Sequence, residues 1–362
     1  MKAMNLRVPG PTPLPLEVRH ALGQDMIHHR GPAFEGLLRE VTAQLAGFFQ
    51  TEGDVLVLTS SGSGGLEAAL VNVLSPGDRV LAVSCGAFGQ RFADIARAYN
   101  ANVVQIDVPW GQAFDAGQVA RALRAHPDVR VLLTTHNETA TGVLNDLQPL
   151  SELLRSLGTR RPVWLVDAVS SLGATDLPMD DWGIDIVVSA SQKAWMAPPG
   201  LALVGVSSHA WQHVAQARCP RYYWNLITAR NYAMRGQTPF TPGLPALYAL
   251  RTSLGIMAEE GLPAIVARHR HMAGHLRSGL RGLGLRLMAE DAVASPTVTA
   301  VYTPNGVAAT QLQQRLAREH GVVVATGQGE FKERLLRIAH MGFCTIKELD
   351  GVLAALEAEL QS

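Results

Sequence analysis

The chain carries PVWLVDAV at residues 162–169 and IDIVVSASQKAW at residues 184–195. Each stretch opens with an apolar run that does not alternate with polar residues, a pattern typical of strands buried on both faces of a mainly parallel sheet. The first run ends on Asp167, and the second leads into Lys193. Because the carboxyl ends of parallel strands meet at one edge of the sheet, we expect both side chains to face the same ligand-binding crevice.

Similar apolar runs recur through the first two thirds of the chain. Segments with helical spacing separate them, and the one from Leu66 to Leu74 ends at Pro76-Gly77 as a helix should. This alternation of strands and helices predicts an α/β fold with helices on both faces of the sheet. The other runs of this kind are residues 55–59, 79–84, 102–108, 129–135 and 201–206.

The alternation weakens after about residue 210, which indicates a second, smaller domain. We divide the chain into a proline-rich N-terminal arm (1–20), a large α/β domain (21–260) and a small C-terminal α+β domain (261–362). Helical patterns and short apolar runs alternate in the last third. The expected helices are 244–257, 263–283 and 346–360, and the expected strands are 298–303, 321–326 and 334–340.

Composition limits the classes of partner. The 362 residues are 47% hydrophobic and 17% charged, and Lys plus Arg equal Asp plus Glu at 31 each. This balance gives no electrostatic reason to expect nucleic acid or an anionic membrane as a partner. The three cysteines have no disulfide or zinc spacing, and we find no signal peptide or membrane-spanning run. We therefore expect a cytoplasmic protein, and its low charge favours an oligomer.

A Gly/Ser turn, residues 60–65, joins the strand at 55–59 to the helical segment that follows. Such a turn directs backbone N–H groups and hydroxyls toward an anion, and a phosphate is its natural occupant. A Walker A loop would need Gly-Lys-Ser/Thr, a dinucleotide fingerprint would need glycine at Glu67, and a serine-hydrolase elbow would need glycine at Ser61. An ordinary flexible βα turn remains the alternative.

Asp167 and Lys193 each have an unremarkable explanation as well. The carboxylate is equally typical of a metal ligand or a helix cap, and a single lysine at a strand end is usually solvated. Combined with the Gly/Ser turn, however, they match the needs of pyridoxal 5′-phosphate (PLP). The cofactor requires an anion site for its phosphate, an acid beside its pyridine nitrogen and an amine for its aldehyde. PLP is therefore the predicted cofactor.

Six segments resemble the class V aminotransferases, and within them the alanine–glyoxylate/serine–pyruvate branch. The resemblance extends over nearly the whole chain and implies the PLP-dependent transferase type I fold. That fold has a mostly parallel seven-stranded sheet in a large domain, a smaller C-terminal domain and a homodimeric assembly. The segments are SSGSGGLEAALVNVLSPGD (60–78), CGAFGQR (85–91), THNETATGVL (135–144), LVDAVSSLGA (165–174), SQKAWMAPPG (191–200) and LLRIAHMG (335–342).

The resemblance also implies a set of cofactor-binding residues. Lys193 would form the Schiff base with PLP and then shuttle the proton at the substrate Cα, and Asp167 would hold the pyridine nitrogen protonated. Phe88 stands where close relatives often have Trp, so stacking is kept and an indole N–H is lost. The remaining expected contacts are Ser61, Gly62 and Ser63 with the phosphate, Thr139 with the ring hydroxyl, Val169 with the ring face opposite Phe88, and Gln192 with the ring region.

Two further groups complete the expected site. Thr238 and Thr241 match a segment that reaches the phosphate of the neighbouring subunit, although relatives often have Tyr at Thr238. Arg337 matches the residue that grips the substrate α-carboxylate, a role that suits the planar guanidinium because it pairs bidentately. The resemblance thus implies a ping-pong transfer from a small L-amino acid, alanine or serine, to a small 2-oxo acid, glyoxylate or pyruvate.

The sequence leaves several alternatives open. Other PLP reactions are a lyase, a cysteine desulfurase or a phosphonate-amine transaminase, and a non-catalytic PLP-binding protein is a further possibility. Cys344 follows Arg337, whereas the reactive cysteine of desulfurases precedes it. His269, His271 and His275 lack an obvious further ligand, so we expect a solvated helix face there and no metal. The roles of His28, His29 and His340 are not assigned.

Overall fold

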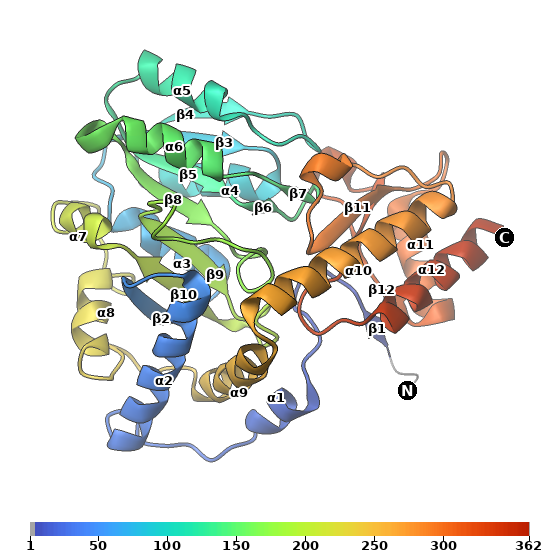
Figure 1. The fold of residues 1–362 in the computed structure, drawn as a ribbon, viewed down its shortest axis with the longest axis horizontal. Helices are drawn as coiled ribbons and strands as arrows, with labels where there is room; N and C mark the ends of the chain where they lie inside the picture. Colours follow the sequence, from blue (N-terminus) through green and yellow to red (C-terminus); the bar gives the residue numbers. More distant parts are fainter. Residues whose placement is uncertain (1–3, 362) are drawn as a thin grey trace.

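A seven-stranded sheet forms the centre of the large part of the molecule in this computed structural model, which describes residues 4–361 (Figure 1). The strand order is β2-β10-β9-β8-β5-β3-β4; β10 runs antiparallel to both neighbours, and the other pairs are parallel. The predicted mostly parallel sheet is confirmed. Its strands are β2 (Asp54–Ser60), β3 (Arg79–Ser84), β4 (Asn102–Asp107), β5 (Val129–Thr135), β8 (Val163–Asp167), β9 (Ile186–Ala190) and β10 (Gly200–Val206).

Helices cover both faces of this sheet because most of its strands turn apolar side chains to both sides. One apolar cluster joins the sheet to α2, α5, α6 and α9, and a second joins it to α3, α4, α7 and α8. The helices are α2 (Pro32–Phe49), α3 (Gly62–Val71), α4 (Ala87–Ala98), α5 (Ala116–Ala125), α6 (Gln148–Ser156), α7 (Ser208–Val214), α8 (Leu226–Ala233) and α9 (Leu244–Glu260). A short hairpin, β6 (Asn137–Glu138) and β7 (Val143–Leu144), follows β5.

The C-terminal part contains a three-stranded antiparallel sheet in the order β11-β14-β13. Three helices share one apolar cluster with it. The proposed domain boundary near residue 260 falls at Gly261, between α9 and α10. These elements are α10 (Leu262–Gly282), β11 (Val298–Tyr302), α11 (Ala309–His320), β13 (Ala325–Thr326), β14 (Leu335–Ala339) and α12 (Ile346–Gln361).

The predicted single strand at 321–326 is wrong, because this segment forms two short strands that pair with different partners. β12 (Val322–Val323) pairs in parallel with β1 (Asn5–Leu6) of the N-terminal arm, whereas β13 pairs with β14. The arm therefore contributes a strand to the small part of the molecule. Residues 1–3 of the predicted arm lie outside the described residues.

Beyond β1, the arm runs along the loop that carries Lys193. The N–H of Ala339 donates to the carbonyl of Arg7 at 2.8 Å, and the Thr12 hydroxyl donates to the Lys193 carbonyl at 2.9 Å. The chain then forms α1 (Leu16–Ala21), which packs on α9. The described part of the arm thus packs on its own chain and connects the small part of the molecule to the predicted cofactor lysine.

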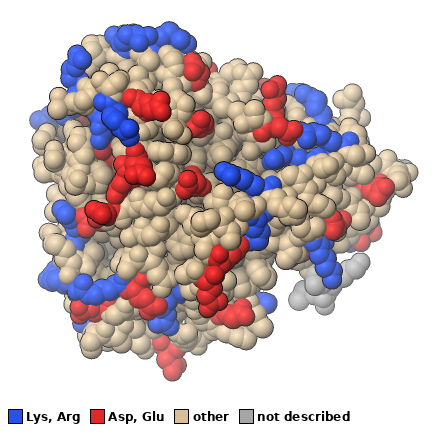
Figure 2. Space-filling model, viewed as in Figure 1, with Lys and Arg blue, Asp and Glu red and all other residues tan. Residues whose placement is uncertain are grey.

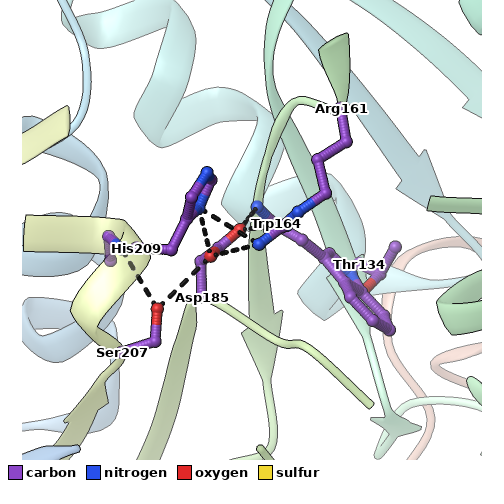
Figure 3. Close-up of polar contacts among 7 residues, drawn as sticks. Thr134, Arg161, Trp164, Asp185, Ser207 and His209 are labelled. Atoms are coloured by element: carbon purple, nitrogen blue, oxygen red, sulfur yellow. Dashed lines mark hydrogen bonds and ion pairs between the residues drawn. The ribbon is translucent and has the colours of Figure 1, made fainter. Parts of the chain in front are cut away.

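A buried ion pair ties β8, β9 and β10 together at the end of the sheet opposite to Lys193 (Figure 3). Arg161 donates to both carboxylate oxygens of Asp185, at 2.6 and 2.9 Å, and the Trp164 N–H donates at 2.7 Å. His209 lies 2.8 Å from the same carboxylate. Burial opposes ionisation, but His209 and Arg161 nevertheless hold the pKa of Asp185 below its ordinary value. These contacts fix the strands whose other ends form the site.

The surface drawn in Figure 2 carries acidic and basic side chains interspersed, without one large area of a single sign. Among residues 4–361, no helix has both the length and the apolar character needed to cross a membrane.

Candidate active site

Asp167 is the last residue of β8 and lies buried at the carboxyl edge of the parallel strands. Its Oδ1 accepts a hydrogen bond from the Val169 N–H at 2.9 Å. Burial raises the pKa of this carboxyl from 3.8 to about 6, although the Val169 N–H and the nearby Lys193 both act in the opposite direction. A carboxylate in this environment gains from a cationic partner, and a protonated pyridine nitrogen is such a partner.

Lys193 follows β9 and is buried beside the N-terminal arm. Its Nζ donates to the carbonyl of Pro9. Burial and the neighbouring Arg337 guanidinium lower the pKa of the ammonium group from 10.5 to about 8, while Asp167 acts in the opposite direction. The structure therefore brings the two predicted catalytic residues together. A lysine with this pKa provides free amine near neutrality, as Schiff-base and proton-transfer chemistry require.

Arg337 lies in the middle of β14 and is also buried. Its Nε donates to the Thr326 carbonyl at 2.8 Å, and one terminal nitrogen lies 3.4 Å from the Thr139 carbonyl. Burial lowers the pKa of the guanidinium to about 10, and Glu138 partly offsets that effect. Since a guanidinium has five N–H donors, two backbone carbonyls leave donors for a ligand carboxylate.

Thr139 lies in a buried hydroxyl network next to Arg337. Its hydroxyl donates to the Ser170 Oγ at 2.7 Å, and Ser170 in turn donates to the Asn137 carbonyl at 3.0 Å. The Asn137 amide also donates to Ser170 and to Thr297 of the small part. The contact of Thr139 with the ring hydroxyl stays a prediction. Sequence reasoning missed the two network partners, because Ser and Asn in a loop have no distinctive pattern.

Glu138 is the most important residue that sequence reasoning missed. Its fully buried carboxylate accepts from the N–H groups of Phe88 at 3.0 Å and Gly89 at 3.1 Å, and from Ala140 at 2.9 Å. A Cβ on Gly86 would overlap this carboxyl group. Burial raises the pKa of Glu138 from 4.5 to about 7. The side chain therefore joins the turn with the predicted stacking ring to the turn with Thr139.

The predicted phosphate turn forms the N-terminus of α3. Ser61 is the N-cap and accepts from the Gly64 N–H at 3.4 Å. A Cβ on Gly62 would lie 2.9 Å from the side chain of Val169, so only glycine lets the turn approach the predicted ring position this closely. Arg91 of α4, which sequence reasoning also missed, donates to the Ser63 hydroxyl at 3.2 Å.

The segment with Thr238 and Thr241 lies at the end of the region between α8 and α9. Thr238 is buried and its hydroxyl donates to the Phe240 carbonyl at 2.8 Å, whereas Thr241 is exposed. Arg30 donates to the Thr238 and Pro239 carbonyls at 2.6 and 3.1 Å and so holds this segment in place. Contact of either threonine with a second subunit stays a prediction.

Two of the histidines singled out in the sequence, His269 and His340, are buried and hydrogen-bonded within the small part of the molecule. His340 is fully buried, its ring nitrogens lie 3.0 Å from the Thr299 hydroxyl and 2.9 Å from the Pro296 carbonyl, and burial lowers its pKa to about 3. The expected solvated face of α10 is wrong for His269, which is buried and accepts from the Gly342 N–H at 3.1 Å. Among residues 4–361, no three His, Cys, Asp or Glu side chains are grouped to hold a metal ion.

The residues present fit PLP at its phosphate, its ring nitrogen and its aldehyde. The first turn of α3 offers N–H groups and hydroxyls, Asp167 is a buried carboxylate, and Lys193 is a buried amine of lowered pKa. In addition, the buried Gln192 Oε1 has no hydrogen-bond partner within the described chain. A ligand beside Gln192 would give that orphaned atom a partner, since buried polar groups are nearly always paired.

Comparison with known proteins agrees with this arrangement. The family model described as "Aminotransferase class-V" matches residues 16–341. A "Soluble hydrogenase 42 kDa subunit" of Anabaena cylindrica is 40% identical over 98% of this chain and 92% of its own. An "L-aspartate--glyoxylate aminotransferase" of Paracoccus denitrificans is 36% identical over 96% and 89%. The solved structure of an alanine–glyoxylate aminotransferase from Nostoc sp. is 32% identical, with a TM-score of 0.95, over 100% of this chain and 96% of that one.

Proposed function

Because this chain belongs to the class-V aminotransferase family, whose members use PLP, we propose that it transfers an amino group from a small L-amino acid to a small 2-oxo acid. Alanine or serine would be the donor and glyoxylate or pyruvate the acceptor, in a ping-pong sequence. The names of the Paracoccus and Nostoc relatives support glyoxylate as acceptor. The observation that carries the proposal is that the buried Arg337 guanidinium lies close enough to Lys193 to lower the pKa of its ammonium group.

The chemistry divides between the cofactor and the side chains around it. When bound, PLP supplies an aldehyde that takes up the amino group and a ring that draws electrons from the substrate Cα. Asp167 would hold the proton on the ring nitrogen, and its burial strengthens that charge pair. Lys193 Nζ would take up and return the proton at the substrate Cα, and the cofactor would supply the second site to which that proton moves.

Substrate binding and water exclusion fall to the surrounding residues. Arg337 would bind the α-carboxylate and thereby orient the Cα–H bond toward Lys193. Pro9 and Thr12 of the arm lie against Lys193, so this part of the chain would exclude water from the amine. Phe88 and Val169 would enclose the ring between them.

Half-reactions of the purified holoenzyme test this proposal. L-Alanine alone should convert the PLP absorbance to that of the pyridoxamine form and release one equivalent of pyruvate. Glyoxylate added afterwards should restore the original spectrum and yield glycine. Sulfide release from L-cysteine, ammonia release from L-serine or conversion of an aminophosphonate, each without pyruvate formation from L-alanine, would assign the chain to a different PLP reaction. Absence of any spectral change with a panel of amino donors would assign it to the non-catalytic class.

A persulfide-forming reaction finds no support at Cys344. This thiol is buried, and burial raises its pKa, which disfavours the nucleophilic thiolate. Cys344 also comes after Arg337 in the sequence, whereas the reactive cysteine of desulfurases lies on a mobile loop that precedes the equivalent arginine.

We propose in addition that the protein is a cytoplasmic homodimer whose subunits complete each other's phosphate sites. Tyr222 is 84% exposed, and Tyr223 stacks on Phe240 with ring centroids 4.6 Å apart. Contiguous exposed aromatic side chains of this kind are typical of subunit interfaces. The exposed Thr241 directly follows Phe240, so pairing through this patch would bring Thr241 toward a neighbouring subunit.

A further inference from the structure

Arg91 is a cation in an electrostatically unfavourable position for the chain alone. It lies in the first turns of α4, and its guanidinium stacks over the Phe88 ring with 4.7 Å between Cζ and the ring centroid. From there Nη1 donates to the hydroxyl of Ser63, in the first turn of α3. A helix N-terminus carries a partial positive charge, so a guanidinium beside it is repelled unless an anion lies between them.

Among the described residues, no acidic side chain forms an ion pair with this guanidinium. Asp94, one turn further along α4, pairs with Arg97 at 2.8 Å and accepts from Gln90 at 2.8 Å. Within residues 4–361, Arg91 forms no ion pair of its own. The positive charge is therefore available to a bound ligand.

The location of Arg91 points to the active site rather than to solvent alone. Although burial dominates the pKa shifts of Asp167 and Lys193, Arg91 is close enough to lower the pKa of each. Gly62 and Ser63 are the first helical residues of α3, whose N–H groups have no acceptor within the helix. The N-terminus of α3 thus has unpaired N–H groups, two serine hydroxyls and the guanidinium of the exposed Arg91 close together.

We propose that Arg91 is the cationic ligand of the PLP phosphate, binding it across the N-terminus of α3 together with the Ser63 hydroxyl. The inference rests on the assignment of Ser61, Gly62 and Ser63 as the phosphate turn. A phosphate dianion removes the repulsion between guanidinium and helix, and charge-assisted hydrogen bonds from arginine are among the strongest that phosphates accept. The same guanidinium would steady the Phe88 ring on which the cofactor stacks.

A comparison of two cofactor forms isolates the contact with the phosphate. The full-length enzyme is freed of PLP and titrated with PLP and with pyridoxal, which lacks the phosphate, for wild type, Arg91→Met and Arg91→Lys. Arg91→Met should raise the Kd for PLP roughly 10- to 100-fold and change the Kd for pyridoxal far less, since pyridoxal feels only the loss of support for Phe88. The Kd for PLP of Arg91→Lys should lie between those of wild type and Arg91→Met, because lysine keeps the positive charge and loses the bidentate guanidinium.

The matched control is Arg97→Met, on the same helix and paired only with groups outside the site, which should leave both Kd values unchanged. Inorganic phosphate should compete with PLP binding less effectively in Arg91→Met than in wild type. Equal weakening of PLP and pyridoxal would overturn the proposal, because it would show that Arg91 acts only by supporting Phe88.

Three further outcomes separate this proposal from the proposed function. If wild type transaminates and Arg91→Met binds PLP as tightly as wild type, the phosphate assignment fails and the reaction stands. If Arg91→Met instead raises KM for aspartate but not for alanine, Arg91 binds a substrate side-chain carboxylate and the phosphate assignment also fails. Absence of transamination in the wild-type enzyme, with the expected loss of PLP affinity in Arg91→Met, would reject the reaction and keep the phosphate contact.

Discussion

Three ionisable side chains in the site, Lys193, Asp167 and Glu138, have pKa values that burial moves toward neutrality. The lowered pKa means that the Lys193 ammonium group loses its proton at a lower pH than in water. The raised pKa values mean that the Asp167 and Glu138 carboxyl groups keep their protons up to a higher pH than in water. Buried charges are costly, so this arrangement lowers the stability of the chain alone and leaves each group responsive to a bound cofactor.

The role of Arg337 makes a prediction for substrate binding. Arg337→Lys should raise KM for the amino donor about 10- to 100-fold, because the ammonium group cannot pair bidentately with the α-carboxylate. PLP affinity should stay unchanged, since the predicted phosphate and ring contacts lie elsewhere. Half-reaction rates as a function of alanine concentration measure the first quantity, and PLP titration measures the second. An unchanged KM would contradict the assignment of Arg337 to the carboxylate.

Glu138 makes a prediction for the pH dependence of stability. Its pKa rises from 4.5 in the unfolded chain to about 7, so its stabilising contribution is complete below about pH 4.5 and is lost as the pH rises through about 7. The unfolding free energy of wild type relative to Glu138→Gln should therefore fall by on the order of 3 kcal/mol from acidic to mildly alkaline pH. Urea unfolding of both cofactor-free proteins at several pH values measures this difference in unfolding free energy. A difference that does not change with pH would refute the raised pKa of Glu138.

Sequence reasoning located Lys193, Asp167 and Arg337, which the structure brings together, and it missed Glu138 and Arg91. The first three stand at strand ends or in a recognisable strand motif, where the α/β fold itself predicts a ligand. Glu138 becomes a site residue only because the N-terminus of α4, some 50 residues earlier, turns its N–H groups toward it. Contacts between segments this far apart leave no local signal in the sequence.

At the scale of the elements, α3 packs closely on the middle of the sheet at Gly65. A Cβ there would lie 2.8 Å from the side chains of both Ala202 and Val188. Gly65→Ala should therefore push α3 away from β9 and β10 and destabilise the protein by about 1–3 kcal/mol. Since α3 carries the phosphate turn, PLP affinity should fall as well.

Gly255 provides the matched control, because it lies within α9 and a Cβ there would meet nothing within 4 Å. Gly255→Ala should stabilise the protein by roughly 0.5–1 kcal/mol, because alanine loses less backbone entropy in a helix. Chemical denaturation of both variants measures the two changes. Equal effects at the two positions would argue against close packing of α3 on the sheet.

Strands and helices with a strong local sequence pattern could be predicted from the sequence. Short strands that exist only because they pair with a distant strand could not. All seven strands of the central sheet appear as apolar runs, and the five strands between the edge strands β2 and β4 are almost fully buried on both faces. The division of residues 321–326 into β12 and β13 depends on β1, more than 300 residues away, and on β14. Two-residue strands have no periodicity to read, so the sequence suggested one strand instead.

For the whole molecule, the exposed aromatic patch predicts a dimer. Sedimentation should give twice the chain mass of 38.8 kDa. Tyr222→Glu should shift the protein toward monomers, because it places a charge in the patch, and it should weaken PLP binding if Thr241 contacts the neighbouring phosphate. Arg318→Glu, an exposed substitution in α11, should change neither property. A monomeric wild-type protein with intact activity would refute the shared phosphate site.

The whole fold places one residue, Lys193, beneath the arm, beside Asp167 and close to Arg337. The most direct test of the account is to reduce the holoenzyme with borohydride, digest it and locate the cofactor by mass spectrometry. Stable attachment of the cofactor at Lys193 alone, together with its loss in Lys193→Ala, is the result that we predict. Attachment at another lysine, or unchanged transamination by Lys193→Ala, would contradict the central claim.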